Sequence, residues 1–186
     1  MEQSLEPPLR AAVHVLETHG YRYAIIGGIA LSLWGVIRTT ADIDIKVLVP
    51  DIDYEKARSV LRAEFAKTAR SQVKQNPLIV SVEIEGVIVD FLLALPGYEE
   101  QIITRAIRRD MGDWEAWVCS AEDLVIQKAV AGRPKDWGDI ELLLIEQFGK
   151  LDETYIDNWL SQFAELLEQP EILIQYQQLT QKIKRL

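Results

Sequence analysis

Residues 27–44 read GGIALSLWGVIRTTADID and contain a Gly-Gly pair followed by an Asp-x-Asp pair. The glycines follow an aromatic and β-branched stretch, residues 21–26, which predicts a strand, and they precede a short helical pattern. The aspartates, Asp42 and Asp44, lie at the head of a second predicted strand, residues 43–49. Because side chains two apart on a strand share one face, we expect both carboxylates to lie together, opposite an apolar face.

These two aspartates and a later one form a candidate metal site. Two carboxylates this close repel each other, and a divalent cation that prefers hard oxygen ligands, such as Mg²⁺, would relieve the repulsion. Asp90 interrupts the apolar run 87–93, where an ionised carboxylate without a partner is costly. It either faces solvent on an edge strand or lies beside the strand of Asp42 and Asp44. The second arrangement is the scaffold of two-metal phosphoryl transfer, whereas the first leaves only solvated acids.

The glycine pair, Gly27 and Gly28, is a candidate phosphate-binding turn. Glycine between a strand and a helix lets the backbone approach a phosphate closely, and the start of the helix offers N–H groups and a positive dipole. A tight turn that binds nothing fits the same two residues. The glycines alone leave both interpretations open.

The rest of the chain predicts strands and helices that interleave first and helices alone afterwards. Before Ser120 the pattern predicts helices over 9–19, 29–35, 53–69 and 98–109, a hairpin of 78–84 with 87–95, and a short edge strand over 114–119. After Ser120 it predicts helices over 123–130, 136–147, 152–167 and 171–183. We therefore expect an α+β core, residues 1–119, and a helical C-terminal extension, residues 120–186, that packs on the core.

Composition limits the function classes. The chain has 186 residues, a net charge of −9 and one cysteine. The acidic balance argues against non-specific coating of nucleic acid, although the basic stretches Lys56–Lys74 and Arg105–Arg109 leave room for a local docking face. No apolar run approaches the roughly 18 residues that span a bilayer, and the acidic, proline-containing start does not read as a signal peptide. We therefore expect a cytoplasmic protein that does not enter a membrane.

Together, residues 27–44 and Asp90 resemble the DNA polymerase β-like nucleotidyltransferase superfamily. Its pattern is a Gly-Gly or Gly-Ser turn, a short helix, an Asp-x-Asp strand and a third Asp on a later strand. The chain looks most like the small bacterial nucleotidyltransferases of the AbiEii toxin type, which carry a block similar to that in residues 123–140. The resemblance implies a core with a mixed, mainly antiparallel sheet flanked by helices.

The resemblance also implies a role for each matching residue. Asp42 and Asp44 would hold two Mg²⁺ or Mn²⁺ ions, and Asp90 would hold the catalytic ion and help deprotonate the acceptor hydroxyl. The residues that would contact the nucleotide are Gly27, Gly28, Ser32, Arg38, Lys128, Arg133, Asp136 and Asp139. One position departs from the pattern, because many members carry Ser where this chain has Gly28. Backbone contacts, or Ser32, would have to replace that hydroxyl.

Some of these residues also have a purely structural interpretation. Lys128 lies on a largely apolar helix, where a lysine can extend its ammonium group to solvent from a buried position. Arg133, Asp136 and Asp139 are one turn apart and fit ion pairs on a helix surface. Arg38 either binds phosphate or neutralises the nearby acids.

The expected activity is metal-dependent transfer of a nucleoside monophosphate from a nucleoside triphosphate to an acceptor hydroxyl. The resemblance to toxins implies RNA or tRNA as acceptor, inhibition of growth as the consequence, and a cognate antitoxin protein as partner. Two alternatives remain at this stage. One is the same reaction on a small molecule, such as an aminoglycoside, or on a protein. The other is a non-catalytic module that binds a nucleotide or a protein. The base preference and the oligomeric state are not predicted.

Overall fold

The computed structural model describes residues 4–66 and 76–185 and divides into two compact units. The sheet unit consists of Met1–Ala30 and Thr39–Cys119. The helical unit consists of Leu31–Arg38 and Ser120–Leu186. The short helix α2 (Gly27–Leu33) therefore begins in the sheet unit and ends in the helical unit.

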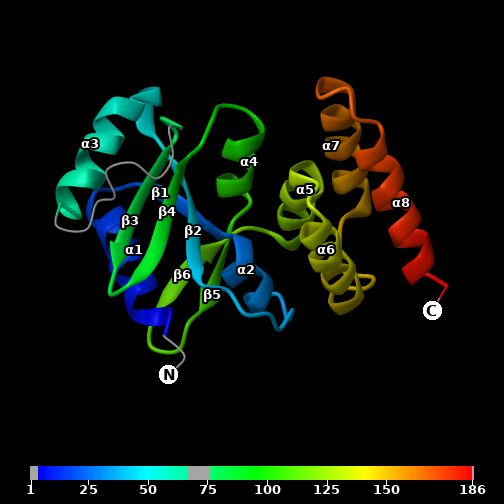
Figure 1. The fold of residues 1–186 in the computed structure, drawn as a ribbon, viewed down its shortest axis with the longest axis horizontal. Helices are drawn as coiled ribbons and strands as arrows, with labels where there is room; N and C mark the ends of the chain where they lie inside the picture. Colours follow the sequence, from blue (N-terminus) through cyan, green and yellow to red (C-terminus); the bar gives the residue numbers. More distant parts are fainter. Residues whose placement is uncertain (1–3, 67–75, 186) are drawn as a thin grey trace. The chain divides into compact units, whose positions relative to one another are not determined.

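The sheet unit contains one six-stranded sheet with the order β3-β4-β2-β1-β6-β5 (Figure 1). The strands are β1 (Arg22–Ile26), β2 (Asp42–Leu48), β3 (Ile79–Ile84), β4 (Val87–Leu93), β5 (Ile107–Asp110) and β6 (Glu115–Val118). Strand β2 pairs in parallel with β4, and β1 pairs in parallel with β6, whereas the other three pairings are antiparallel. This confirms the predicted α+β fold with a mixed, mainly antiparallel sheet.

The alternation of residues along β2 produces one apolar face and one polar face. Ile43, Ile45 and Val47 are fully buried, and their partners on β4 are also apolar and buried. Two helices cover this face, α1 (Glu6–Thr18) and α3 (Tyr54–Glu64), which lie on the same side of the sheet (Figure 1). The 3₁₀ turn η1 (Pro50–Ile52) precedes α3, and Asp53 caps α3 by accepting a hydrogen bond from the Lys56 N–H at 3.0 Å.

The polar face of β2 carries Asp42, Asp44 and Lys46. Helix α4 (Tyr98–Thr104) packs on this side, because Glu99 forms an ion pair with the buried Lys46. Glu99 also accepts a hydrogen bond from the Leu95 N–H at 2.7 Å, which anchors the start of α4 beside the sheet. The helix therefore meets β2 at Lys46, two residues beyond Asp44.

The helical unit contains α5 (Ala121–Ala131), α6 (Pro134–Glu146), α7 (Glu153–Leu166) and α8 (Glu171–Ile183). Ser120 and Asp152 cap α5 and α7, each by accepting a backbone N–H at 3.0 Å. The segment 31–38 belongs to this unit, and the Gln147 side chain donates to the Trp34 carbonyl at 2.8 Å. None of the described helices is both long and apolar enough to cross a lipid bilayer.

Three local predictions differ from the structure. The helix predicted over 98–109 ends at Thr104, and residues 107–110 form β5, because Ile107 and its neighbours pair with β6. Strand β6 is not an edge strand, since β5 lies outside it. Helix α3 ends at Glu64, and the rest of its predicted length reaches residues that the structure does not describe. That the C-terminal extension packs on the core stays a prediction.

A buried carboxylate links two helices of the helical unit and can be tested. Asp123 of α5 is fully buried, and the Tyr155 hydroxyl of α7 donates to it at 2.8 Å. Hydrogen bonds to charged groups contribute about 1.5–3 kcal/mol, so we expect Tyr155→Phe to lower the free energy of unfolding by that amount. Urea titrations followed by circular dichroism measure the change.

Tyr176→Phe on α8 is the matched control for this prediction. The Tyr176 hydroxyl is also buried, but it has no hydrogen-bond partner in the described part of the chain. Removing a buried hydroxyl that makes no hydrogen bond should leave stability unchanged or slightly higher. Equal losses in the two variants would contradict the assigned role of the Tyr155–Asp123 hydrogen bond.

Candidate active site

Strands β2 and β4 bring three carboxylates to one face of the sheet. Asp44 is the register partner of Asp90 in the parallel pair, so their side chains point to the same side. Asp42 lies two residues before Asp44 and therefore shares that face. Strand β4 lies between β3 and β2, and Asp90 is only 5% exposed. Asp90 is thus not a solvated acid on an edge strand.

Neutral hydroxyl groups hold two of these carboxylates. The Ser81 hydroxyl of β3 donates to Asp90, and the two residues are register partners. The Thr40 hydroxyl donates to Oδ1 of Asp42 at 3.0 Å. A hydroxyl can orient a carboxylate without bringing a positive charge to it. Sequence reasoning missed both residues, although Ser81 is a polar residue inside an apolar strand, a usable signal.

The two glycines make room for side chains of the site. A Cβ atom on Gly27 would lie 2.4 Å from Oδ2 of Asp44, and Gly27 has a φ of +67°, which disfavours any other residue. A Cβ atom on Gly28 would lie 2.5 Å from Oγ1 of Thr40. Thr40 therefore fills the space that a serine at position 28 would need. The absence of side chains at Gly27 and Gly28 thus lets the side chains of Asp44 and Thr40 lie close to the backbone of the turn.

The donor set suits a divalent cation by its chemistry. Three carboxylates on adjacent strands are the hard oxygen ligands that Mg²⁺ prefers. Among residues 4–66 and 76–185, no three His, Cys, Asp or Glu side chains are already arranged around a metal position. The assignment of Asp42, Asp44 and Asp90 as metal ligands therefore stays a prediction that rests on their shared face.

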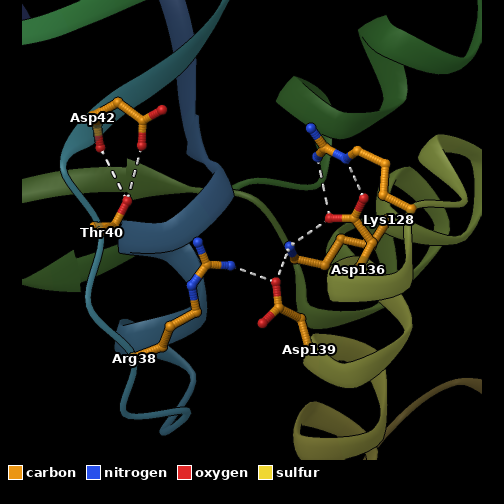
Figure 2. A network of polar contacts seen from close by, with 7 residues as sticks. Arg38, Thr40, Asp42, Lys128, Asp136 and Asp139 are labelled. Carbon is orange, nitrogen blue, oxygen red and sulfur yellow. Dashed lines mark hydrogen bonds and ion pairs between the residues drawn. The ribbon is translucent and has the colours of Figure 1, made fainter.

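The helical unit holds a network of five charged side chains (Figure 2). Lys128 of α5 donates to Asp139 at 2.6 Å and to Asp136 at 3.4 Å. Arg133 contacts Asp136 through two nitrogens, at 2.5 and 3.1 Å. Arg38 donates to Asp139 at 2.6 Å. With three cations and two anions, the network has a formal charge of +1.

Burial distinguishes this network from ion pairs on a helix surface. The side chains of Asp136, Asp139 and Lys128 are 0%, 7% and 9% exposed. Lys128 therefore does not extend its ammonium to solvent. Burial alone would raise the pKa of Asp136, but the hydrogen bond from Arg133 and the charge of Lys128 outweigh it and hold that pKa below its usual range. Asp136 is thus ionised at neutral pH.

The predicted site residues fall into two groups. Asp42, Asp44, Asp90, Gly27 and Gly28 belong to the sheet unit. The other predicted nucleotide contacts belong to the helical unit, namely Ser32, Arg38, Lys128, Arg133, Asp136 and Asp139. Of these, all but Ser32 join the charged network, and Ser32 is exposed on α2.

The structure describes the first predicted basic stretch only in part, and it divides the second between the end of a helix and a strand. Of the first, Lys56, Arg58 and Arg62 lie on α3, whereas Lys67, Arg70 and Lys74 lie outside the described residues. Of the second, Arg105 follows α4, and Arg108 and Arg109 are consecutive on β5, so their side chains point to opposite faces. Arg108 is paired with Glu115 at 3.2 Å.

Comparison with protein families gives one match over nearly the whole chain. A family described as nucleotidyl transferase of unknown function (DUF2204) matches residues 6–185. No curated protein sequence matches the chain at a significant level.

Several solved structures share the fold. An antigenic nucleotidyltransferase-like protein from Paracoccidioides brasiliensis is 17% identical with a TM-score of 0.59, over 93% of this chain and 92% of that one. ANT(2″)-Ia, in complex with adenylyl-2″-tobramycin, is 15% identical with a TM-score of 0.58, over 87% and 97%. A lincomycin-bound lincosamide antibiotic adenylyltransferase is 17% identical with a TM-score of 0.57, over 76% and 98%. At these identities the likeness shows the fold alone.

The contact between Gly27 and Asp44 predicts a specific pattern of stability losses. Gly20 has a similar φ of +71° but open space around its Cβ position, so Gly20→Ala reports the backbone cost alone, about 1–2 kcal/mol. We expect Gly27→Ala to cost about 1–3 kcal/mol more, because its Cβ also collides with Asp44. In an Asp44→Ala background most of this excess should disappear. Urea unfolding of Gly20→Ala, Gly27→Ala, Asp44→Ala and the double variant Gly27→Ala/Asp44→Ala measures these losses. An excess loss in Gly27→Ala that Asp44→Ala does not reduce would contradict the contact.

The buried network predicts a pH-dependent contribution of Asp136. Asp136→Asn removes the carboxylate that Arg133 pairs with and one of the two carboxylates that hold the buried Lys128, which keeps Asp139. We therefore expect a loss of about 1.5–3 kcal/mol at pH 7. Because the pKa of Asp136 is lowered on folding, this contribution is complete above the unfolded value of about 3.9 and is lost as the pH falls through the lower folded value. The difference in free energy of unfolding between wild type and Asp136→Asn should therefore narrow below about pH 4.

Urea titrations at a series of pH values measure this gap. The control is Glu141→Gln, which breaks an exposed ion pair with Lys182 and should cost no more than about 1 kcal/mol. A gap between wild type and Asp136→Asn that stays constant down to pH 3 would show that the ionised carboxylate does not stabilise the fold.

Proposed function

Because this chain belongs to the family of nucleotidyl transferases of unknown function, we propose that it transfers a nucleoside monophosphate from a nucleoside triphosphate to an acceptor hydroxyl and releases pyrophosphate. One observation carries the proposal: the parallel pairing of Asp44 with Asp90, with Asp42 on the same face. Three carboxylates on two adjacent strands are what two-metal phosphoryl transfer requires of a protein.

Asp42 and Asp44 would hold two divalent ions, Mg²⁺ or Mn²⁺, and Asp90 would share one of them. When bound, such ions lower the pKa of the acceptor hydroxyl and neutralise charge on the transferring and leaving phosphates. Asp90 would also help to deprotonate the acceptor hydroxyl as a general base. Its burial and its hydrogen bond from Ser81 support this role, because both restrict the carboxylate to one orientation.

In each unit, the residues that the resemblance assigns to the nucleotide suit an anion. Gly27 and Gly28 of the sheet unit would offer backbone N–H groups, and the helical unit offers cations. Lys128, Arg133 and Arg38 supply positive charge that Asp136 and Asp139 only partly cancel. A cluster of net charge +1 suits an anionic triphosphate, and the two aspartates keep the cations ordered before the nucleotide arrives.

The proposed acceptor is RNA, tRNA in particular, in a toxin–antitoxin context in the cytoplasm, with a cognate antitoxin as partner. This rests on the resemblance of residues 27–44 and 123–140 to toxin-type nucleotidyltransferases. A small molecule with a free hydroxyl is the second candidate. It is supported by the opposite directions of Arg108 and Arg109 and by the ligands in two structures of similar fold, adenylyl-2″-tobramycin and lincomycin.

One experiment tests the reaction and the acceptor together. The pure protein is incubated with Mg²⁺ and each α-labelled nucleoside triphosphate, with total RNA, protein extract, an aminoglycoside panel or lincosamides as acceptor. Label in the RNA fraction supports the RNA proposal. If the protein contacts RNA phosphates, the logarithm of its affinity for single-stranded RNA should fall with the logarithm of the salt concentration, with a slope of about 0.7 per contact. Label on a small molecule supports the second candidate. No label in any fraction contradicts the proposed activity.

Substitution of the paired carboxylates tests the site. We expect Asp44→Asn and Asp90→Asn each to abolish transfer while the protein stays folded. Because removal of one charge relieves repulsion between carboxylates, the melting temperature without ligand should stay equal or rise. In wild type, Mg²⁺ with nucleotide should stabilise the fold by about 2.7 kcal/mol when the ligand concentration is one hundred times the Kd. We expect both variants to lose most of this stabilisation.

The control for these variants is Glu55→Gln, an exposed acid in the first turn of α3, which should behave as wild type. Melting curves with and without ligand, and transfer of label, are measured on the same preparations. Wild-type transfer in either aspartate variant would show that the site is assigned to the wrong residues.

A further inference from the structure

Thr40 lies between α2 and β2 and contacts two parts of the candidate active site. Its hydroxyl donates to Oδ1 of Asp42 at 3.0 Å, and the Asp42 carbonyl oxygen lies 3.4 Å away (Figure 2). On its other side, Thr40 fills the position where a side chain on Gly28 would begin, 2.5 Å from Oγ1 and 2.6 Å from Cβ of Thr40.

We infer that Thr40 is a positioning residue for Asp42, and that a glycine is required at position 28 because any larger residue would displace Thr40. The inference rests on the proposed function, in which Asp42 is a metal ligand. Asp42 is exposed and is the first residue of β2, so strand packing does little to restrict its carboxylate. The hydrogen bond from Thr40 engages one carboxylate oxygen, Oδ1, and does not use Oδ2.

The chemistry of threonine suits this task. A hydroxyl has a single proton to donate, and the shorter contact directs it to the carboxylate rather than to the carbonyl. Branching at Cβ restricts the side chain to few rotamers, so the hydroxyl keeps its direction. Thr40 also lies so close to Gly28 that a Cβ atom there would collide with it, and this proximity restricts the side chain further. Partners of this kind, which orient a metal ligand, typically change metal affinity by about 10- to 100-fold when removed.

The test compares variants that separate the hydroxyl from the shape of the side chain. Thr40→Val keeps the shape and removes the hydroxyl, whereas Thr40→Ser keeps the hydroxyl. Thr39→Val is the matched control on the neighbouring exposed threonine. Binding of Mn²⁺ without nucleotide, measured by electron paramagnetic resonance, reports the site independently of turnover, and melting temperatures report the fold.

We expect Thr40→Val to bind Mn²⁺ about 10- to 100-fold more weakly with an unchanged melting temperature. Thr40→Ser and Thr39→Val should bind as wild type does. In turnover assays, Thr40→Val should raise the Mg²⁺ concentration needed for half the maximal rate and leave the KM of the acceptor unchanged. Wild-type affinity for Mn²⁺ in Thr40→Val would overturn the inference, and so would a loss of affinity in Thr40→Val that Thr40→Ser does not repair.

Two further variants keep the result interpretable. Gly28→Ala retains the Thr40 hydroxyl but pushes it away from Asp42, so this variant should bind Mn²⁺ more weakly. The measurement serves even if Thr40→Val does not fold. Wild-type Mn²⁺ binding in Gly28→Ala would overturn the inference. Asp42→Asn separates the inference from the proposed function. If Asp42→Asn loses Mn²⁺ and Thr40→Val does not, only the positioning role fails. If Asp42→Asn binds Mn²⁺ normally, the proposed metal site fails as well.

Discussion

The parallel pairing of β2 with β4 is the constraint on which the candidate site depends. It sets Asp44 opposite Asp90 and places Asp42 on the same face. Burying an ionised carboxylate is costly unless it is hydrogen-bonded, and Ser81 on β3 supplies such a bond to Asp90. Three adjacent strands, β3, β4 and β2, therefore bring the three carboxylates and the Ser81 hydroxyl to one face of the sheet. The apolar face of β2, buried against α1 and α3, stabilises the sheet that carries this charge.

Glycine and hydroxyl residues accompany the three carboxylates without adding charge. Gly27 gives space to the Asp44 carboxylate, and Gly28 gives space to Thr40, which in turn contacts Asp42. Each glycine is thus explained by a neighbour that is distant in sequence. Thr40 and Ser81, which donate to Asp42 and Asp90, are neutral hydroxyls and therefore bring no positive charge to the carboxylates.

The helical unit buries one cation, Lys128, and pairs it with carboxylates. Lys128 is buried between Asp136 and Asp139, and Arg133 and Arg38 complete the network. Buried charges are tolerated when they are paired, and an arrangement of three cations with two anions leaves an excess of positive charge. The sheet unit therefore carries a group of carboxylates on one face, and the helical unit carries a network with more cations than anions.

The sequence by itself determined the identity and order of most helices and strands, because hydrophobic periodicity and capping residues act locally. It also determined that Asp42 and Asp44 share a face, since that follows from the two-residue repeat of a strand. Only the tertiary structure decided that Asp90 lies opposite Asp44, that residues 107–110 form a strand rather than a helix, and that Thr40 covers Gly28. It likewise decided that Asp136 and Asp139 are buried against Lys128. The pairing of Asp44 with Asp90 joins strands that are far apart in the chain, whereas β5 pairs with the next strand and Lys128 with the next helix. In each case the structure depends on which second element packs there, and no pattern within one element specifies that.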